Sequence, residues 1–118
     1  MSQQNAIYIS LGSNQGDRLK HLQQAVDFIF KRIGNIQLIA KVYNTPALGF
    51  DGPNFLNTCL VVRSDMSAQT AMETLLDIEK QMGRERANSG GYESRIIDLD
   101  MLMFNEAVPN LQLFWHWW

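Results

Sequence analysis

Two aspartates, Asp98 and Asp100, stand two residues apart in the apolar stretch "RIIDLDMLMF". The stretch predicts a β-strand, in which successive side chains point to opposite faces. Both carboxylates should then share one face, with Cβ atoms about 6.5 Å apart, together with Leu102 and Phe104. The opposite face should carry Ile97, Leu99, Met101 and Met103.

Like charges this close need a compensating cation. Mg²⁺ suits them, because this hard ion takes oxygen ligands and commonly combines one or two carboxylates with substrate phosphates. Two alternatives stay open on these residues alone: a solvated pair on an exposed sheet face, or neutralisation by local arginines in a structural salt bridge.

Arginines are dense just before the aspartate strand, at Arg84, Arg86 and Arg95, where the segment is interrupted by "NSGG". A guanidinium binds phosphate oxygens bidentately, so arginines beside paired aspartates suggest phosphate together with Mg²⁺. A solvated basic loop is the alternative. The stretch "GSNQGDR" lacks the lysine and the spacing of a phosphate-binding P-loop.

Glu79 follows Leu75 and Leu76 on the helical stripe that should face the core. A surface acid near the end of the helix is one explanation, and it is the more frequent one for such a position. A functional acid paired with Arg84 or Arg86 is the other.

The segment "YNTPALGFDGPNFLN" combines two prolines with aromatic and amide side chains. Phe55 and Asn57 share strand parity, so a flat heteroaromatic ring could rest on the phenyl group while the amide reads its edge. Core packing of Phe55 beside an Asn-stabilised turn is equally compatible with this pattern.

The elements that must position these residues follow from periodicity. Strands are predicted at 6–12, 36–45 and 55–64 and at the aspartate stretch. A helix is predicted from Asp17 to Ile33, closed by Gly34–Asn35, and another from its N-cap Ser67 to Met82, stopped by Gly83. The residues expected to point inward are Leu19, Leu22, Val26, Ile29, Phe30 and Ile33 in the first helix, and Met72, Leu75, Leu76 and Met82 in the second.

The order β-α-β-β-α-β fits the α+β ferredoxin-like arrangement, an antiparallel sheet with both helices on one face. The 118 residues, 46% of them hydrophobic, suffice for a single domain spanning 1–118.

Composition narrows the functional classes. The net charge of −2 offers no chain-wide attraction to nucleic acid or to an anionic membrane, so neither is expected as a partner. No window reaches the apolar length of a membrane span. The single cysteine, Cys59, cannot form an internal disulfide and is expected in the core. A cytoplasmic location is predicted.

Taken together, the motifs resemble the 6-hydroxymethyl-7,8-dihydropterin pyrophosphokinase family. Its pieces occur here in the family's order and approximate spacing, over residues 6 to about 108: "ISLGSNQGDR", "YNTPALG", "FLN", "IEKQMGRER" and "RIIDLDML". The resemblance implies transfer of pyrophosphate from ATP to the hydroxymethyl group of the pterin in folate biosynthesis, with release of AMP.

The resemblance also implies a role for each matching residue. Asp98 and Asp100 match the ligands of two Mg²⁺ ions that bind with ATP. Residues that match the pterin site are Gly12, Asn14, Thr45, Pro46, Leu48, Phe55 and Asn57. Residues placed against ATP are Glu79, Arg84, Arg86 and Arg95, and the catalytic set is Arg84, Arg95, Asp98 and Asp100.

This sequence departs from the family in two places. "GYESR" stands where many members have "WGPR", so Tyr92 replaces a tryptophan of the substrate site. Family chains continue for tens of residues past the aspartate strand, whereas "VPNLQLFWHWW" ends at Trp118, so the chain is expected to be C-terminally truncated with an atypical tail at 109–118. That aromatic tail makes a homodimer one expectation, and a non-catalytic ferredoxin-like binding or assembly module is the alternative to an enzyme.

Overall fold

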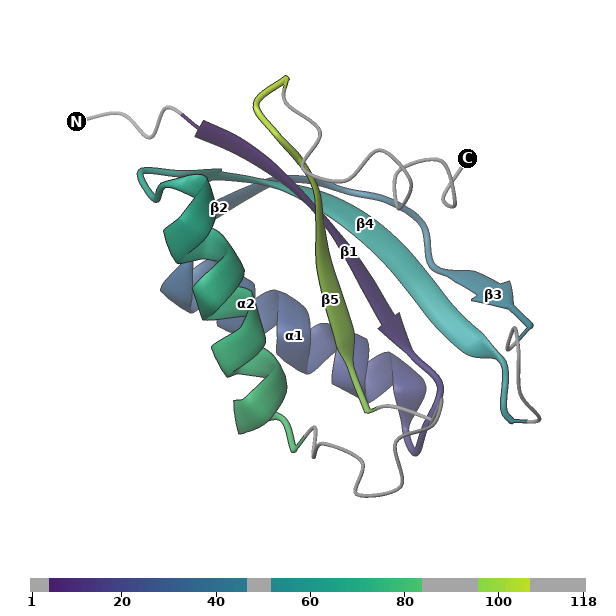
Figure 1. Ribbon diagram of the computed structural model, residues 1–118. Coiled ribbons are helices and arrows are strands. Elements are labelled where there is room, and N and C mark those ends of the chain that lie inside the picture. The colour runs from purple at the N-terminus through teal and green to yellow at the C-terminus, as the bar shows by residue number, and fades with distance from the viewer. Residues whose placement is uncertain (1–4, 47–51, 84–95, 107–118) are drawn as a thin grey trace.

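The computed structural model describes residues 5–46, 52–83 and 96–106. Its elements are β1 (Asn5–Ser13), α1 (Arg18–Arg32), β2 (Asn35–Ile39), β3 (Tyr43–Thr45), β4 (Phe55–Ser64), α2 (Ala68–Gln81) and β5 (Asp98–Phe104). The sheet has the order β2-β4-β1-β5, with β3 also paired to β4, and each of these strand pairs is antiparallel. Both helices cover one face of this sheet (Figure 1). The predicted α+β ferredoxin-like fold is confirmed.

One predicted strand, 36–45, is two strands in the structure. β2 pairs with the second half of β4, and β3 pairs with its first three residues. Between them, the Ala40 N–H donates to the Cys59 carbonyl at 2.8 Å. Residues 36–45 therefore still follow β4, but along two separate pieces of strand.

The core lies between the helices and the sheet. β1 and β4 present alternate residues to it, among them Ile7, Ile9, Leu11, Leu60 and Val62, all buried. α1 contributes Leu22, Ala25 and Ile29, and α2 contributes Ala71, Leu75 and Ile78. Four residues expected to point inward are exposed instead: Leu19, Phe30, Met72 and Leu76. They flank the buried stripes, because each helix touches the sheet along a narrower arc than its apolar pattern covers.

The ends of both helices follow the chemistry expected of them. Ser67 caps α2 by accepting from the Thr70 N–H, and Gly83 ends it with a positive φ of 93°. Gly34 ends α1 for a tertiary reason: a Cβ there would lie 2.0 Å from the Arg63 carbonyl oxygen of β4.

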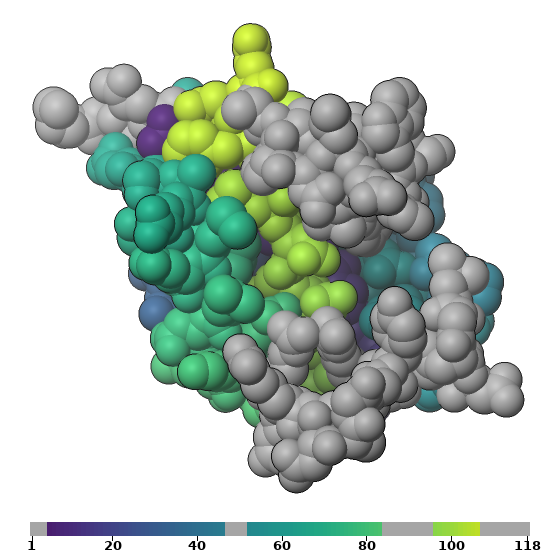
Figure 2. Space-filling model, in the orientation of Figure 1, coloured from purple at the N-terminus to yellow at the C-terminus, as the bar shows by residue number. Residues whose placement is uncertain are grey.

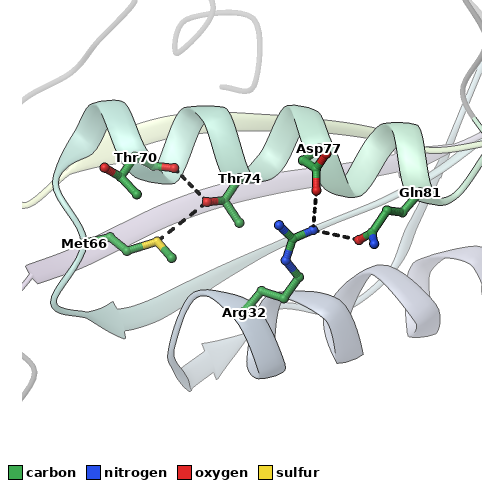
Figure 3. A network of polar contacts seen from close by, with 6 residues as sticks. All are labelled: Arg32, Met66, Thr70, Thr74, Asp77 and Gln81. Atoms are coloured by element: carbon green, nitrogen blue, oxygen red, sulfur yellow. Dashed lines mark hydrogen bonds and ion pairs between the residues drawn. The ribbon is translucent and has the colours of Figure 1, made fainter.

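A polar cluster joins the two helices. Arg32 of α1 reaches Asp77 at 2.8 Å and Gln81 at 2.7 Å, both on α2 (Figure 3). The side chains of Arg32 and Asp77 are 33% and 53% exposed, so the ion pair adds little to stability.

β5 contains a bulge that changes which side chains share a face. Ile9 pairs with Met101 but Tyr8 pairs with Met103, so Leu102 is an extra residue in β5. The alternation predicted from sequence holds from Asp98 to Leu102, which lines the groove on the helix-free face, and is wrong for Met103 and Phe104. Phe104 lies opposite buried Ile7 and packs on the core, while Met103 lies opposite Tyr8 on the helix-free face.

Within the described residues, no helix is long and apolar enough to cross a membrane.

Candidate active site

The paired aspartates lie on the face of the sheet that the helices leave open. Their neighbour Leu99 is buried in the core, and alternation along the strand directs Asp98 and Asp100 to the other side, where both are half-buried. Across β1 they face Gly12 and Ser10 respectively. These two small residues leave room beside the carboxylates.

The chemistry of this pair fits a hard divalent cation. The pair offers oxygen ligands on one face at the spacing of alternate strand residues. Among the described residues, no group of three or more His, Cys, Asp or Glu side chains could hold a metal ion. Two carboxylates are too few to complete the coordination of a divalent cation by themselves. They fit a cation whose remaining ligands include phosphate oxygens of a bound substrate.

Glu79 lies beneath the same strand. Its side chain is 2% exposed, and its Oε2 accepts from the Leu99 N–H at 2.8 Å. The explanation as a surface acid is therefore wrong. Glu79 lies one turn beyond Leu75, which is itself buried, and that spacing is the sequence signal for its burial.

An amide lies on the same open face two strands away. Asn57 Nδ2 of β4 donates to Thr45 Oγ1 of β3 at 2.5 Å. A Cβ on Gly12 would lie 2.8 Å from Asn57 Oδ1 and 3.5 Å from Phe55 Cδ1. The prediction that Phe55 and Asn57 share one face of the strand is confirmed. Because Gly12 has no side chain, the side chains of both residues can extend over β1 at this position.

Two residues that follow β1, Asn14 in the turn and Arg18 at the start of α1, bind the backbone of the loop that leads into β4. Asn14 is fully buried and donates to the Pro53 carbonyl at 3.3 Å. Arg18 Nη1 donates to the Asn54 carbonyl at 2.7 Å. The sequence analysis did not identify Arg18 as a residue of the site. Its position in the motif "GSNQGDR" is the sequence feature that could have indicated it. Both side chains fix the backbone immediately before Phe55.

The register brings the two halves of the site into one line. Gly12 pairs with Asp98 on one side and with Asn57 on the other. Neighbouring strands lie about 4.8 Å apart, so the Cα atoms of Asp98 and Asn57 are about 10 Å apart. A carboxylate pair and a fixed amide thus face the same side of the sheet across one small residue.

An apolar groove of about 840 Å³ continues from this line along the open face. Thr45 and Asn57 line it at one end, and Leu38, Ile39, Tyr43, Leu102 and Met103 are among its other walls. Cys59 also lines the groove and is only partly buried, so its expected place in the core is wrong. Burial nevertheless raises the pKa of the Cys59 thiol.

Several predicted site residues lie outside the described part of the chain. They are Leu48, Arg84, Arg86, Tyr92 and Arg95, and the same holds for the tail at 109–118 with its expected dimer contact. Pro46 is described and exposed directly after β3. The structure thus brings together Gly12, Thr45, Phe55, Asn57, Asp98 and Asp100.

In comparisons with known proteins, the model of the 7,8-dihydro-6-hydroxymethylpterin-pyrophosphokinase family matches residues 8–116. The match extends past residue 108, where the motif resemblance was expected to end. Two relatives are named 2-amino-4-hydroxy-6-hydroxymethyldihydropteridine pyrophosphokinase. That of Porphyromonas gingivalis is 35% identical over 108 residues, which are 90% of this chain and 73% of the relative. That of Bacillus subtilis is 34% identical over 112 residues, 92% of this chain and 66% of the relative.

A third relative is the mitochondrial folate synthesis bifunctional protein of Pisum sativum. It is 35% identical over 106 residues, which are 89% of this chain and 20% of that protein. The structure defines an α+β domain of the ferredoxin-like class, with carboxylates and an amide on the open face of its antiparallel sheet. The chain belongs to the 7,8-dihydro-6-hydroxymethylpterin-pyrophosphokinase family.

Proposed function

We propose that this chain transfers pyrophosphate from ATP to the hydroxymethyl group of 6-hydroxymethyl-7,8-dihydropterin, with Mg²⁺ and with release of AMP, in cytoplasmic folate biosynthesis. One observation carries the proposal: the line Asp98–Gly12–Asn57 across three neighbouring strands. This line places a carboxylate pair, which would bind a metal-bound phosphate, about 10 Å from the amide of Asn57. A pterin is a bicyclic ring with one hydroxymethyl arm, and this spacing suits a pterin whose ring edge meets the amide while its arm points toward the phosphate. Family membership supports the same reaction class.

The pterin end of the proposed site is built on β3 and β4. Asn57 offers a carbonyl oxygen and a remaining N–H to the edge of the ring, while its bond to Thr45 fixes the amide orientation. Phe55 on the same face offers an aromatic surface for stacking. Asn14 and Arg18, which hold the preceding loop, keep these two side chains in place.

The phosphate end is built on β5. Asp98 and Asp100 would hold Mg²⁺, which when bound supplies positive charge to the phosphate oxygens of ATP. The arginines expected there, Arg84, Arg86 and Arg95, would add cationic contacts to the same oxygens. Their role stays a prediction from the sequence.

The reaction then needs mainly positioning. The pterin hydroxyl oxygen attacks the β-phosphorus of ATP in line, the bond from that phosphorus to the α,β-bridging oxygen breaks, and AMP leaves. The hydroxyl proton is released to solvent. Holding both substrates on one rigid sheet lowers the entropic part of the barrier, while charge near the phosphates stabilises the transition state.

Product analysis tests the proposal. The 118-residue chain is incubated with ATP, Mg²⁺ and the hydroxymethyl pterin, and nucleotides are separated by ion-exchange chromatography alongside ³¹P NMR. AMP and a pterin diphosphate in equal amounts are expected. ADP would show an ordinary kinase, and no turnover despite pterin binding would favour the non-catalytic binding module.

A further inference from the structure

Glu79 contacts the backbone between the two candidate metal ligands. It lies near the C-terminal end of α2, which adjoins β5 in the space-filling view (Figure 2). Its Oε2 accepts from the N–H of Leu99, the residue that separates Asp98 from Asp100. Both partners of this bond are almost fully buried, Glu79 at 2% and Leu99 at 5% exposure.

The direction of this N–H follows from strand geometry. Among the described strands, β5 pairs only with β1 and is an edge of the sheet. Backbone N–H groups alternate in direction along a strand, so the Leu99 N–H points away from β1 while those of Asp98 and Asp100 point toward it. A buried donor on the outer edge costs free energy unless an acceptor reaches it. Glu79 is that acceptor.

A carboxylate does more at this place than a neutral acceptor would. Its hydrogen bond to a backbone N–H is charge-assisted and therefore stronger than a neutral one.

We propose that Glu79 is a positioning residue for the paired aspartates. It fixes the Leu99 peptide and thereby holds both carboxylates at a constant spacing on the open face, where the divalent cation would bind. The inference rests on the proposed function for the identity of the cation, but the hydrogen bond itself does not.

Three variants separate this role from a general structural one. Glu79→Ala removes the acceptor, and Glu79→Gln keeps an oxygen acceptor at nearly the same volume but removes the charge. Glu73→Gln is the matched control, because Glu73 lies on the exposed side of the same helix. If Glu79→Ala fails to fold, the comparison of the two Gln variants carries the test.

The first measurement is amide hydrogen exchange at Leu99 by NMR, on the protein without ligands. Exchange should become about tenfold faster in Glu79→Ala, less so in Glu79→Gln, and should not change in Glu73→Gln. Unchanged protection of Leu99 in Glu79→Ala would overturn the inference.

The second measurement is Mn²⁺ binding by electron paramagnetic resonance with a non-hydrolysable ATP analogue, beside calorimetric pterin binding. The Mn²⁺ dissociation constant should rise about tenfold in Glu79→Ala and rise less in Glu79→Gln, with the pterin constant changed less than about twofold. An equal loss of both affinities would show a general structural role and overturn the inference. Absence of AMP from the wild-type chain would instead refute the proposed function, because neither measurement here needs turnover.

Discussion

Replacing Gly12 by alanine should separate ligand binding from folding. The new Cβ would lie 2.8 Å from Asn57 Oδ1. An ordinary contact is longer by about half an ångström or more, so one of the two groups has to move. Asn57 Oδ1 is the end of a side chain, whereas the alanine methyl is fixed to a central strand. The amide should therefore rotate away, and the fold should be spared.

The expected size of the effect follows from the bond that this rotation disturbs. Asn57 Nδ2 donates to Thr45 Oγ1 at 2.5 Å, and a hydrogen bond of this kind contributes about 1–2 kcal/mol when its loss leaves polar groups badly placed. The pterin dissociation constant should rise about 5- to 30-fold. Stability should fall by no more than about 1–2 kcal/mol, the contribution of that bond, and part of the loss should be offset because alanine in a strand costs less backbone entropy than glycine.

A double-mutant cycle provides the assay. Pterin affinity is measured by calorimetry for the wild type, Gly12→Ala, Asn57→Ala and the double variant, and stability by urea unfolding. Asn57→Ala alone should weaken binding by about 1–3 kcal/mol, and Gly12→Ala should add little in that background. An unchanged dissociation constant in Gly12→Ala, or the same loss with and without Asn57, would refute the reasoning.

Three further predictions follow. Asp98→Asn or Asp100→Asn should abolish turnover with little change in the urea midpoint, since each removes a metal ligand while relieving like-charge repulsion; full activity in both would disprove the metal assignment. Gly34→Ala should lower the free energy of unfolding by about 2–3 kcal/mol, because its Cβ would collide with the backbone oxygen of Arg63 at 2.0 Å; an unchanged urea midpoint would contradict this. Burial raises the pKa of the Cys59 thiol above its ordinary value of 9.0, so less of the reactive thiolate is present at a given pH than in an exposed thiol. Alkylation of Cys59 by iodoacetamide should therefore be slower than that of a free thiol and should accelerate as pH rises. A rate equal to that of glutathione near pH 8 would contradict this.

Local patterns in the sequence were enough to predict the elements and part of the site. Periods of two and of about three and a half residues depend only on neighbouring residues, so strands, helices and the shared face of Asp98 and Asp100 could be read directly. The Ser67 cap and the Gly83 stop are equally local. The motifs in their order also led to the correct family.

Only the tertiary structure determined which residues of different elements face one another. The bulge at Leu102 moved Phe104 to the core, because register is set by the partner strand and not by the strand itself. Glu79 faces Leu99 only because α2 packs against the edge strand β5. The closeness of Gly12 to Asn57, which joins the two halves of the site, likewise arises when β1 pairs with β4 over a sequence separation that no local pattern spans.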